Sequence, residues 1–452
     1  MGPLKLSDIA ALLGGAQVGA DVLVETVATD SRALPADSLF IALRGERFDG
    51  HDFIAQAHAG GAVAALVERP GGWPLPHVVV DDTRLALGRL AAAVRARLPV
   101  RVVGVTGSNG KTTVKEMTAA ILRQAGPTLA TTGNLNNDIG VPLTLLRLTA
   151  GHAYAVVEMG ASSAGEIDYL ARLARPDVGL VNNAGPAHLA GFGSQDGVAR
   201  GKGEMFLALA PEAAAVINAD DAYAPLWREY AGRRRIVDFG IDQPAAVRAE
   251  AIDGSSFLLR TPAGEARVAL PLAGRHNVMN ALAAAAAATA LDIPLPQIAA
   301  GLAATPAIKG RLNRRPARAG AWLLDDTYNA NPNSLRAGLE VLAAESGERW
   351  LVLGDMGELG PEAEALHAQA GEWALAAGVS RLFAVGRLAP AAAQRFGCHG
   401  ESFDSKTALI TRLAANLRPG VTVLVKGSRS SGMEQVVEAL LAAESAEAAK
   451  GN

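Results

Sequence analysis

The chain has few of the residues that mark secreted or nucleic-acid-binding proteins. It contains a single cysteine, Cys398, in 452 residues, so no internal disulfide can form, and no second ligand stands near it at metal-site spacing. Aromatic residues make up 4% of the chain, charged residues 19%, and the formal net charge is -3. This balance marks neither a polyanion-binding surface nor a disordered chain. We therefore expect an inert thiol in a reducing compartment and no nucleic-acid partner.

Long apolar runs are also missing. The longest apolar stretch, near Ala281 to Leu291, is shorter than the roughly 20 residues of a membrane-spanning helix, and Pro294 and Pro296 follow it. The first residues contain no long apolar run, and Leu6 stands where a myristoylation signal has Ser or Thr. We expect a cytoplasmic protein without membrane insertion.

The length of the chain predicts several domains. A chain of 452 residues is too long to form a single hydrophobic core, because long chains divide into domains of roughly 100 to 200 residues. Leu98-Pro99 and Arg315-Pro316 precede new series of strand-like and helix-like segments. We predict three domains, at residues 1–98, 99–313 and 314–452.

Short apolar runs of strand length alternate with helical patterns, which predicts an α/β fold. The first region contains SLFIAL at 38–43 and HVVV at 77–80. In the central region the runs are VRVVGV at 100–105, AYAVVE at 153–158, VGLVNN at 178–183 and AAAVIN at 213–218. A hairpin at 255–272 and an alanine-rich helix from Ala281 follow them. We expect the central sheet to be mostly parallel.

The last region has the pattern of a separate doubly wound domain. Its strand-like runs are AWLLDD at 321–326, WLVLGD at 350–355, RLFAVG at 381–386 and VTVLVKGS at 421–428. Open sheets of this kind bind ligands beyond the carboxyl ends of their strands. Asp355 and Lys426 stand at such ends.

The strongest motif is TGSNGKTT, which follows the run at 100–105 and precedes a helical pattern. Backbone N–H groups in a glycine-rich turn at a helix N-terminus form a cradle for phosphate. The motif therefore predicts ATP binding by Thr106, Gly107, Ser108, Asn109, Gly110, Lys111, Thr112 and Thr113. Val105 stands where the general pattern has its first glycine, so this loop is a shorter variant. By itself the loop does not separate kinases, GTPases, transport ATPases and ligases.

Three further residues are candidates for chemistry near this loop. Glu158 ends an apolar strand and could bind a hard cation or cap the following helix. His188 follows the run at 178–183 and so leads to the ligand edge of the sheet. The composition of the segment around Lys202 is typical of a solvated lysine near a helix start.

The order of the motifs along the chain resembles that of the Mur ligases. The motifs are TGSNGKTT, NLNNDIGVPLTLL, VVEMGAS, AHLAGFGS, GKGEMF, GRHNVMNA, GRL and DDTYNANP. TDSR at 29–32 and LFIALRGERFDGHDF at 39–53 resemble the family's uridine-nucleotide domain, and LGDMGELG and VKGSRSSGMEQ resemble its C-terminal domain. The resemblance covers essentially the whole chain.

The resemblance implies an N-terminal α/β uridine-nucleotide domain, a central P-loop-type domain and a C-terminal Rossmann-like domain. The C-terminal domain would close over ATP and bind the incoming dipeptide. Within the family, the motifs are similar to those of the member that adds D-alanyl-D-alanine to a UDP-N-acetylmuramoyl-tripeptide through an acyl phosphate. The implied cofactors are ATP and Mg²⁺, and we expect a monomer.

The resemblance also assigns roles to residues. Lys111, Glu158, His188 and Lys202 would be catalytic, and Thr112, Glu158, His188 and a carbamylated Lys202 would surround magnesium. A carbamate turns a repelling ammonium into an anionic oxygen ligand. The family segment usually read as A-K-G-E is Gly201-Lys202-Gly203-Glu204 here.

The remaining implied contacts are with ATP and the carrier substrate. Asn277, Asn280, Arg311, Asp326, Tyr328 and Asn329 would contact ATP. The muramoyl substrate would contact Ser31, Arg32, Asn134, Asn136, Asn137 and Asp138. Asn-rich turns are common without a ligand, and the segment Asn329–Pro332 is also a plausible lead-in for a helix.

Other functions remain open at this point. Folylpolyglutamate synthases have a similar loop, but the uridine-type segment and DDTYNANP argue against them. The sister ligase that adds diaminopimelate or lysine usually shows D-N-P-[RK], which the chain lacks. A P-loop kinase or transport ATPase would turn over nucleotide without an amine substrate, and a scaffold that holds a UDP-sugar would need no catalytic residues.

Overall fold

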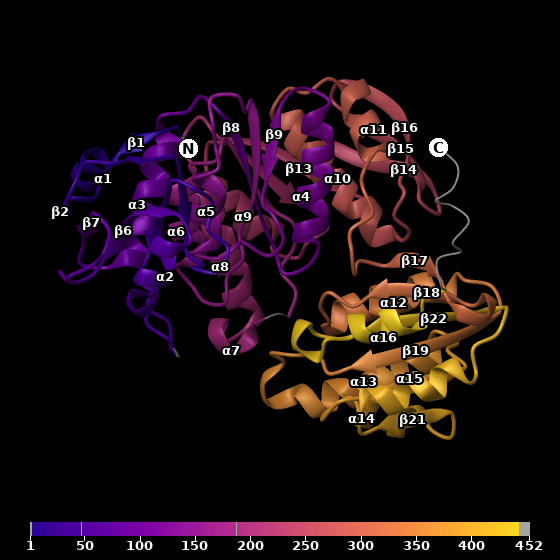
Figure 1. Ribbon diagram of the computed structural model, residues 1–452. Coiled ribbons are helices and arrows are strands. Elements are labelled where there is room, and N and C mark those ends of the chain that lie inside the picture. Colours follow the sequence, from indigo (N-terminus) through magenta and orange to yellow (C-terminus); the bar gives the residue numbers. More distant parts are fainter. Residues whose placement is uncertain (1, 47, 187, 443–452) are drawn as a thin grey trace, which may run out of the picture.

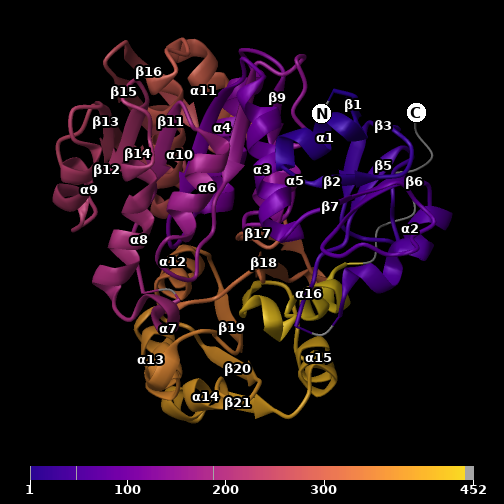
Figure 2. The same cartoon turned by 90° about the vertical axis from the view of Figure 1, so that its left-hand side faces the viewer.

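The computed structural model describes residues 2–46, 48–186 and 188–442. Three main sheets, each covered by helices, confirm the predicted α/β fold (Figure 1). The six-stranded sheet lies below the other two in both views (Figures 1 and 2). Across the residues described, no helix combines the length and apolarity needed to cross a membrane.

The N-terminal sheet has five strands in the order β2-β7-β6-β5-β4, and only β2 runs antiparallel to its neighbour. A small pair, β1 and β3, stands beside it. The elements are β1 (Leu4–Lys5), α1 (Leu6–Leu13), β2 (Ala16–Val18), β3 (Leu23–Val24), β4 (Thr26–Ala28), β5 (Ser38–Ile41), η1 (Gly50–Phe53), α2 (Ile54–Ala59), β6 (Ala62–Val67), β7 (His77–Val79) and α3 (Thr83–Ala96).

The central sheet has nine strands in the order β16-β15-β14-β13-β12-β11-β8-β10-β9. It is parallel except for the hairpin at one edge, where β15 runs antiparallel to β14 and β16. Its strands are β8 (Arg101–Thr106), β9 (Thr128–Ala130), β10 (Tyr154–Glu158), β11 (Val178–Val181), β12 (Ala214–Asn218), β13 (Arg235–Gly240), β14 (Val247–Asp253), β15 (Ser256–Thr261) and β16 (Gly264–Ala269).

Helices cover both faces of the central sheet. They are α4 (Lys111–Arg123), α5 (Gly140–Leu145), α6 (Glu166–Ala174), α7 (Leu189–Phe192), α8 (Gln195–Leu207), α9 (Ala224–Ala231), α10 (Arg275–Ala290) and α11 (Leu295–Ala303). The alanines of α10 are buried against α4 and the strands β11 to β14. Small side chains let this helix lie close to the sheet, which brings its N-terminal turn beside the phosphate loop.

The C-terminal sheet has the order β17-β18-β22-β19-β20-β21, and only β17 is antiparallel. The predicted division at 313/314 falls inside β17. The elements are β17 (Asn313–Pro316), η2 (Arg318–Gly320), β18 (Trp322–Asp326), α12 (Pro332–Ala343), β19 (Glu348–Gly354), η3 (Gly360–Glu362), α13 (Ala363–Ala376), β20 (Arg381–Val385), α14 (Pro390–Phe396), β21 (Gly400–Phe403), α15 (Lys406–Ala414), β22 (Val421–Lys426), η4 (Arg429–Ser431) and α16 (Glu434–Leu440).

The order of strands in the central sheet determines where the site lies. The first strand of the central domain, β8, lies between β11 and β10, so the direction of winding changes at β8. Ligands bind at such switch points, beyond the carboxyl ends of the strands. Register pairs Val105 of β8 with Glu158 and Thr106 with Val181. The phosphate loop, Glu158 and the residues after β11 therefore meet at one edge of the sheet.

Candidate active site

The phosphate loop connects β8 to α4 as the sequence predicts. Gly110 has φ 79°, and a Cβ at this position would lie 2.3 Å from Oδ1 of Asn280 and 2.6 Å from Nδ2 of Asn182. Only glycine fits both the angle and the space. The Lys111 ammonium donates to the carbonyl oxygen of Gly107 at 2.8 Å, and burial lowers its pKa. The loop is thus held tightly around its lysine.

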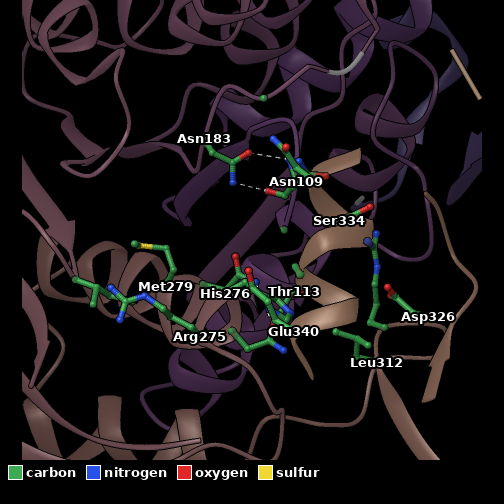
Figure 3. Close-up of a pocket in the computed structure, with 18 of the residues that line it drawn as sticks. Asn109, Thr113, Asn183, Arg275, His276, Met279, Leu312, Asp326, Ser334 and Glu340 are labelled. Carbon is green, nitrogen blue, oxygen red and sulfur yellow. Dashed lines mark hydrogen bonds between the residues drawn. The ribbon is translucent and has the colours of Figure 1, made fainter. Parts of the chain in front are cut away.

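Two asparagines after β11 fix the middle of the loop. The backbone N–H of Asn109 donates to Oδ1 of Asn183 at 2.8 Å, and Nδ2 of Asn183 donates back to the Asn109 carbonyl at 3.1 Å (Figure 3). Asn182 donates to the same carbonyl at 2.9 Å and to Oδ1 of Asn280 at 3.0 Å. These bonds set the loop's conformation before any ligand arrives.

Glu158 is buried at the end of β10, 1% exposed, and carries an unpaired oxygen. Its Oε1 accepts from Nδ2 of Asn136 at 2.8 Å. Its buried Oε2 has no hydrogen-bond partner in the described part of the chain. A buried carboxylate oxygen without a partner is costly, and a hard cation would satisfy it. Glu158 does not cap the next helix, because α6 begins at Glu166 after Gly165.

Lys202 lies in the middle of α8 and is 1% exposed, which excludes the alternative of a solvated lysine near a helix start. Its Nζ donates to the carbonyl oxygen of Ala161 at 3.1 Å and lies 5.3 Å from the centre of the Phe192 ring. Burial, together with the nearby Lys111 charge, lowers the pKa of the amine to about 7. A neutral amine of this kind can react with carbon dioxide, so the site fits a carbamate.

Three of the four predicted metal ligands line one cavity of about 290 Å³: Thr112, Glu158 and His188. Lys202 contacts the wall of this cavity through Ala161. The Nδ1 atom of His188 lies 2.7 Å from Oε2 of Glu358, and burial lowers the pKa of the imidazole. Within the ranges described, no group of three or more His, Cys, Asp or Glu side chains is arranged to hold a metal.

A second cavity of about 460 Å³ lies between α10 and the C-terminal domain (Figure 3). Seven residues predicted to contact ATP line it, namely Asn109, Gly110 and Thr113 of the phosphate loop and helix α4, and Asn277, Asn280, Arg311 and Asp326. Tyr328 and Asn329 line the smaller cavity, as does Arg311, whose guanidinium lies 4.1 Å from the centre of the Tyr328 ring. Because Asn109, Gly110 and Arg311 line both cavities, the two form adjoining parts of one site.

The larger cavity includes residues that sequence analysis does not single out. They are Asn183, Ala184, Gly185, Asp221, Ile241, Arg275, His276, Met279, Leu312, Asn333, Ser334, Ala337 and Glu340, whereas Lys426, which also lines this cavity, stands at the end of a predicted strand. Position after a predicted strand is the signal that could have found Asn183, and it already draws attention to Lys426. Burial lowers the pKa of His276 to about 4, and its buried Nδ1 has no partner among the described residues. No local pattern distinguishes His276 from a structural histidine.

The C-terminal domain contributes a buried charged pair to the larger cavity and one contact to the phosphate loop. Lys426, at the end of β22, pairs with buried Asp326 at the end of β18, and burial lowers the pKa of Lys426. Asn331, the residue before α12, donates from Nδ2 to Oδ1 of Asn109 at 2.7 Å. The segment Asn329–Pro332 is a helix lead-in as expected, because Oδ1 of Asn331 also accepts from the N–H of Ser334.

The residues predicted to contact the carrier substrate separate into two groups. Asn134, Asn136 and Asn137 line the smaller cavity. Asn137 also accepts from the N–H of Gly140 at 2.9 Å, at the start of α5. Asp138 instead pairs with Arg84 of α3, and Arg32 pairs with Asp30 at 2.7 Å. Ser31 donates to Gln56 at 3.2 Å.

Sequence comparisons match this chain to one family along most of its length. Models described as the Mur ligase family catalytic domain, the Mur ligase middle domain and the Mur ligase glutamate ligase domain match residues 23–101, 105–288 and 310–429. The UDP-N-acetylmuramoyl-tripeptide–D-alanyl-D-alanine ligase of Escherichia coli K12 is 51% identical, over 97% of this chain and 98% of its own. The enzyme of the same name from Haemophilus influenzae is 41% identical with the same coverage.

Solved structures give the same result. A crystal structure of MurF from Acinetobacter baumannii has a TM-score of 0.90 at 39% identity and covers 97% of this chain and 98% of that one. MurF from Thermotoga maritima, in complex with ADP, has a TM-score of 0.81 at 28% identity, with 92% and 96% coverage. Because the family models together match most of the chain and relatives at 51% and 41% identity cover nearly all of it, the chain belongs to the Mur ligase family.

Proposed function

We propose that this chain joins D-alanyl-D-alanine to UDP-N-acetylmuramoyl-tripeptide, with cleavage of ATP to ADP and phosphate, and so forms the UDP-linked pentapeptide of peptidoglycan synthesis. The observation that carries the proposal is one cavity that combines the phosphate loop, the unpaired oxygen of Glu158 and, at its wall, the buried amine of Lys202. The name shared by relatives that are 51% and 41% identical supports the choice of substrates.

The chemistry has two steps. The terminal carboxylate of the tripeptide attacks the γ-phosphorus of ATP, which forms an acyl phosphate and releases ADP. The amine of D-alanyl-D-alanine then attacks the acyl carbon, and phosphate leaves through a tetrahedral intermediate. Two anions meet in the first step, so the enzyme must neutralise charge and hold the reactants in line.

The residues of the smaller cavity fit the first step. Lys111 supplies a positive charge inside the loop, and the N–H groups in the first turn of α4 would donate to the phosphates. Thr112, Glu158 and His188 would hold magnesium, with Lys202 as a carbamate beside them. A magnesium ion at this place would neutralise charge on the β- and γ-phosphates.

The larger cavity fits the rest of ATP. Asn277 and Asn280 would face the adenine side, whereas Arg311, Asp326, Tyr328 and Asn329 would close over the ribose and phosphates. Nε of Arg311 is buried without a partner among the residues described, so a bound anion would satisfy it. Asn134, Asn136 and Asn137 would lie along the path of the muramoyl peptide, next to the γ-phosphate.

The three regions 1–98, 99–313 and 314–452 would divide the substrates between them. The first would bind the UDP end of the carrier, through Ser31 and Arg32, the second ATP, and the third the dipeptide. Arg32 would have to exchange Asp30 for a phosphate oxygen, whereas Asp138 would act through its bond to Arg84 at the start of α3. The enzyme would work as a monomer in the cytoplasm, where its nucleotide substrates are made.

Phosphate release tests the proposed function. Phosphate should appear only when ATP, Mg²⁺, a UDP-linked tripeptide and D-alanyl-D-alanine are all present, because the acyl phosphate needs an amine to complete the reaction. Parallel assays with the diaminopimelate and lysine tripeptides would identify the third residue of the peptide. Replacement of Lys111 by alanine should lower kcat by roughly a hundredfold or more, as for other groups that stabilise transferred phosphate. Release that is independent of the dipeptide would indicate an ATPase instead.

A further inference from the structure

A carboxylate of the C-terminal domain contacts His188 of the central domain. The Oε2 atom of Glu358 lies 2.7 Å from Nδ1 of His188. His188 directly precedes α7, whereas Glu358 lies in the loop between β19 and η3. The contact therefore joins two of the three sheets at the smaller cavity, which His188 lines.

Both residues have backbone conformations that are unfavourable for side chains with a Cβ. His188 has φ 54° and Glu358 has φ 60°, in the left-handed region. The loop around Glu358 is anchored by its buried neighbours Met356 and Leu359. The N–H of Met356 also donates to Nε2 of buried His367 at 2.8 Å. A loop anchored at Met356 and Leu359 thus presents the Glu358 carboxylate to the imidazole.

The contact determines which nitrogen of His188 is available to a ligand. A carboxylate oxygen 2.7 Å from a ring nitrogen favours the proton on that nitrogen, so Nδ1 carries the proton and Nε2 keeps its lone pair. In residues 2–46, 48–186 and 188–442 no hydrogen bond to Nε2 of His188 is formed. A carboxylate on one ring nitrogen with a metal on the other is the usual arrangement around a metal-ligating histidine.

We propose that Glu358 is a positioning residue that holds His188 with Nε2 directed to the metal, so that docking of the C-terminal domain completes the metal site. This inference rests on the proposed function, in which His188 is a magnesium ligand. Domain closure and metal binding then favour each other, because the same contact contributes to both. The competing interpretation is an ordinary exposed ion pair, since the Glu358 side chain is 66% exposed, and such pairs contribute little.

Manganese affinity distinguishes the two interpretations. The full-length enzyme, loaded with a non-hydrolysable ATP analogue and the UDP-linked tripeptide, is titrated with Mn²⁺, and free Mn²⁺ is measured by its EPR signal. Glu358→Ala should raise the Mn²⁺ dissociation constant by roughly 10- to 100-fold, the range for lost partners of metal ligands. Glu358→Gln, which keeps an acceptor oxygen, should recover part of the affinity. Glu364→Ala changes an exposed glutamate in the first turn of α13 and is the matched control.

A spectroscopic measurement separates positioning from a general loss of structure. In protein with ¹⁵N-labelled histidine, the His188 signals, assigned by their absence in His188→Gln, should show the proton on Nδ1. Glu358→Ala should shift this tautomer while the other histidine signals stay in place. Equal Mn²⁺ affinities for Glu358→Ala and Glu364→Ala, or an unchanged tautomer, overturn the proposal. Failure of the wild-type complex to bind Mn²⁺ would overturn the proposed function as well, so the two failures are distinguishable.

Discussion

At the scale of single residues, burial decides what an ordinary side chain can do. Lysine side chains are long and usually charged, but Lys202 is buried in the structure. Its Nζ contacts one carbonyl oxygen and one aromatic ring. Desolvation disfavours the charged form, and its pKa is lowered to about 7. The amine is therefore neutral over much of the pH range in which a solvated lysine is charged.

The pKa of Lys202 predicts how carbamylation depends on pH. Only the neutral amine reacts with CO₂, and its fraction rises as pH increases through about 7. When CO₂ is added back to enzyme depleted of it, activity should return at a measurable rate. This rate, divided by the concentration of dissolved CO₂, should increase about tenfold between roughly pH 6 and pH 8 and then level off. ¹³C NMR with labelled CO₂ would follow the carbamate directly.

Lys202→Met provides the control for this measurement, because it keeps the volume of the side chain and removes the amine. It should lose most activity, show no carbamate signal and not respond to CO₂. Reactivation of the wild type at a rate independent of pH would contradict the assignment.

At the scale of elements, the start of α12 serves two purposes through one residue. Oδ1 of Asn331 caps the helix by accepting from the N–H of Ser334 at 2.9 Å. Nδ2 of the same side chain donates to Asn109 in the phosphate loop at 2.7 Å. A helix of the C-terminal domain is thereby tied to the loop that would hold ATP. Stability and nucleotide binding can be separated here by substitution.

Asn331→Asp should leave stability nearly unchanged, because a carboxylate still caps the helix, within about 0.5 kcal/mol. It should raise the KM for ATP about five- to tenfold, because it places a negative charge next to the phosphate loop, a penalty of about 1–1.4 kcal/mol. Asn331→Ala removes the cap as well and should lower the free energy of unfolding by about 1 kcal/mol. Urea denaturation and steady-state kinetics measure the two effects.

Ser405→Ala is the matched control. Ser405 caps α15 by accepting from the N–H of Ala408 at 3.2 Å, and α15 lies away from the loop (Figure 1). The variant should lose about 1 kcal/mol of stability with no change in the KM for ATP. A KM that rises equally in both alanine variants would show that lost stability, not the contact with Asn109, weakens binding.

At the scale of the whole molecule, contacts between domains gather at the site. Among the described residues, Asn331 contacts Asn109 and His188 contacts Glu358 between the central and C-terminal domains, and Arg311 contacts Thr112 at 3.4 Å. Arg311 belongs to the linker between α11 and β17. An acyl phosphate would hydrolyse in contact with water, so a domain that closes over the site protects it.

Small-angle X-ray scattering tests this closure. The radius of gyration should be larger for the free enzyme than for the complex with an ATP analogue and the UDP-linked tripeptide, because phosphates bridge the loop and the C-terminal domain. Glu358→Ala and Asn331→Ala should weaken the compaction. Identical scattering with and without ligands would mean that the domains do not close on binding.

Much of the fold and part of the site follow from the sequence. The strand-like runs at 100–105, 153–158 and 350–355 all contain strands in the structure, and the segment TGSNGKTT connects β8 to α4. These features depend on the pattern of side chains within a few neighbouring residues, and this pattern can be read directly from the sequence. The domain limits and the roles of the individual site residues stay predictions.

What the sequence by itself determined is therefore local: strand and helix positions, a loop whose glycines permit one backbone path, and the cap at Asn331. Only the tertiary structure decided that β8 lies between β10 and β11, which unites Glu158 and Asn183 with the loop. It also decided that Lys202 is buried and that Glu358 reaches His188. Burial and partner choice depend on segments far away in the chain, so no local pattern of residues encodes them.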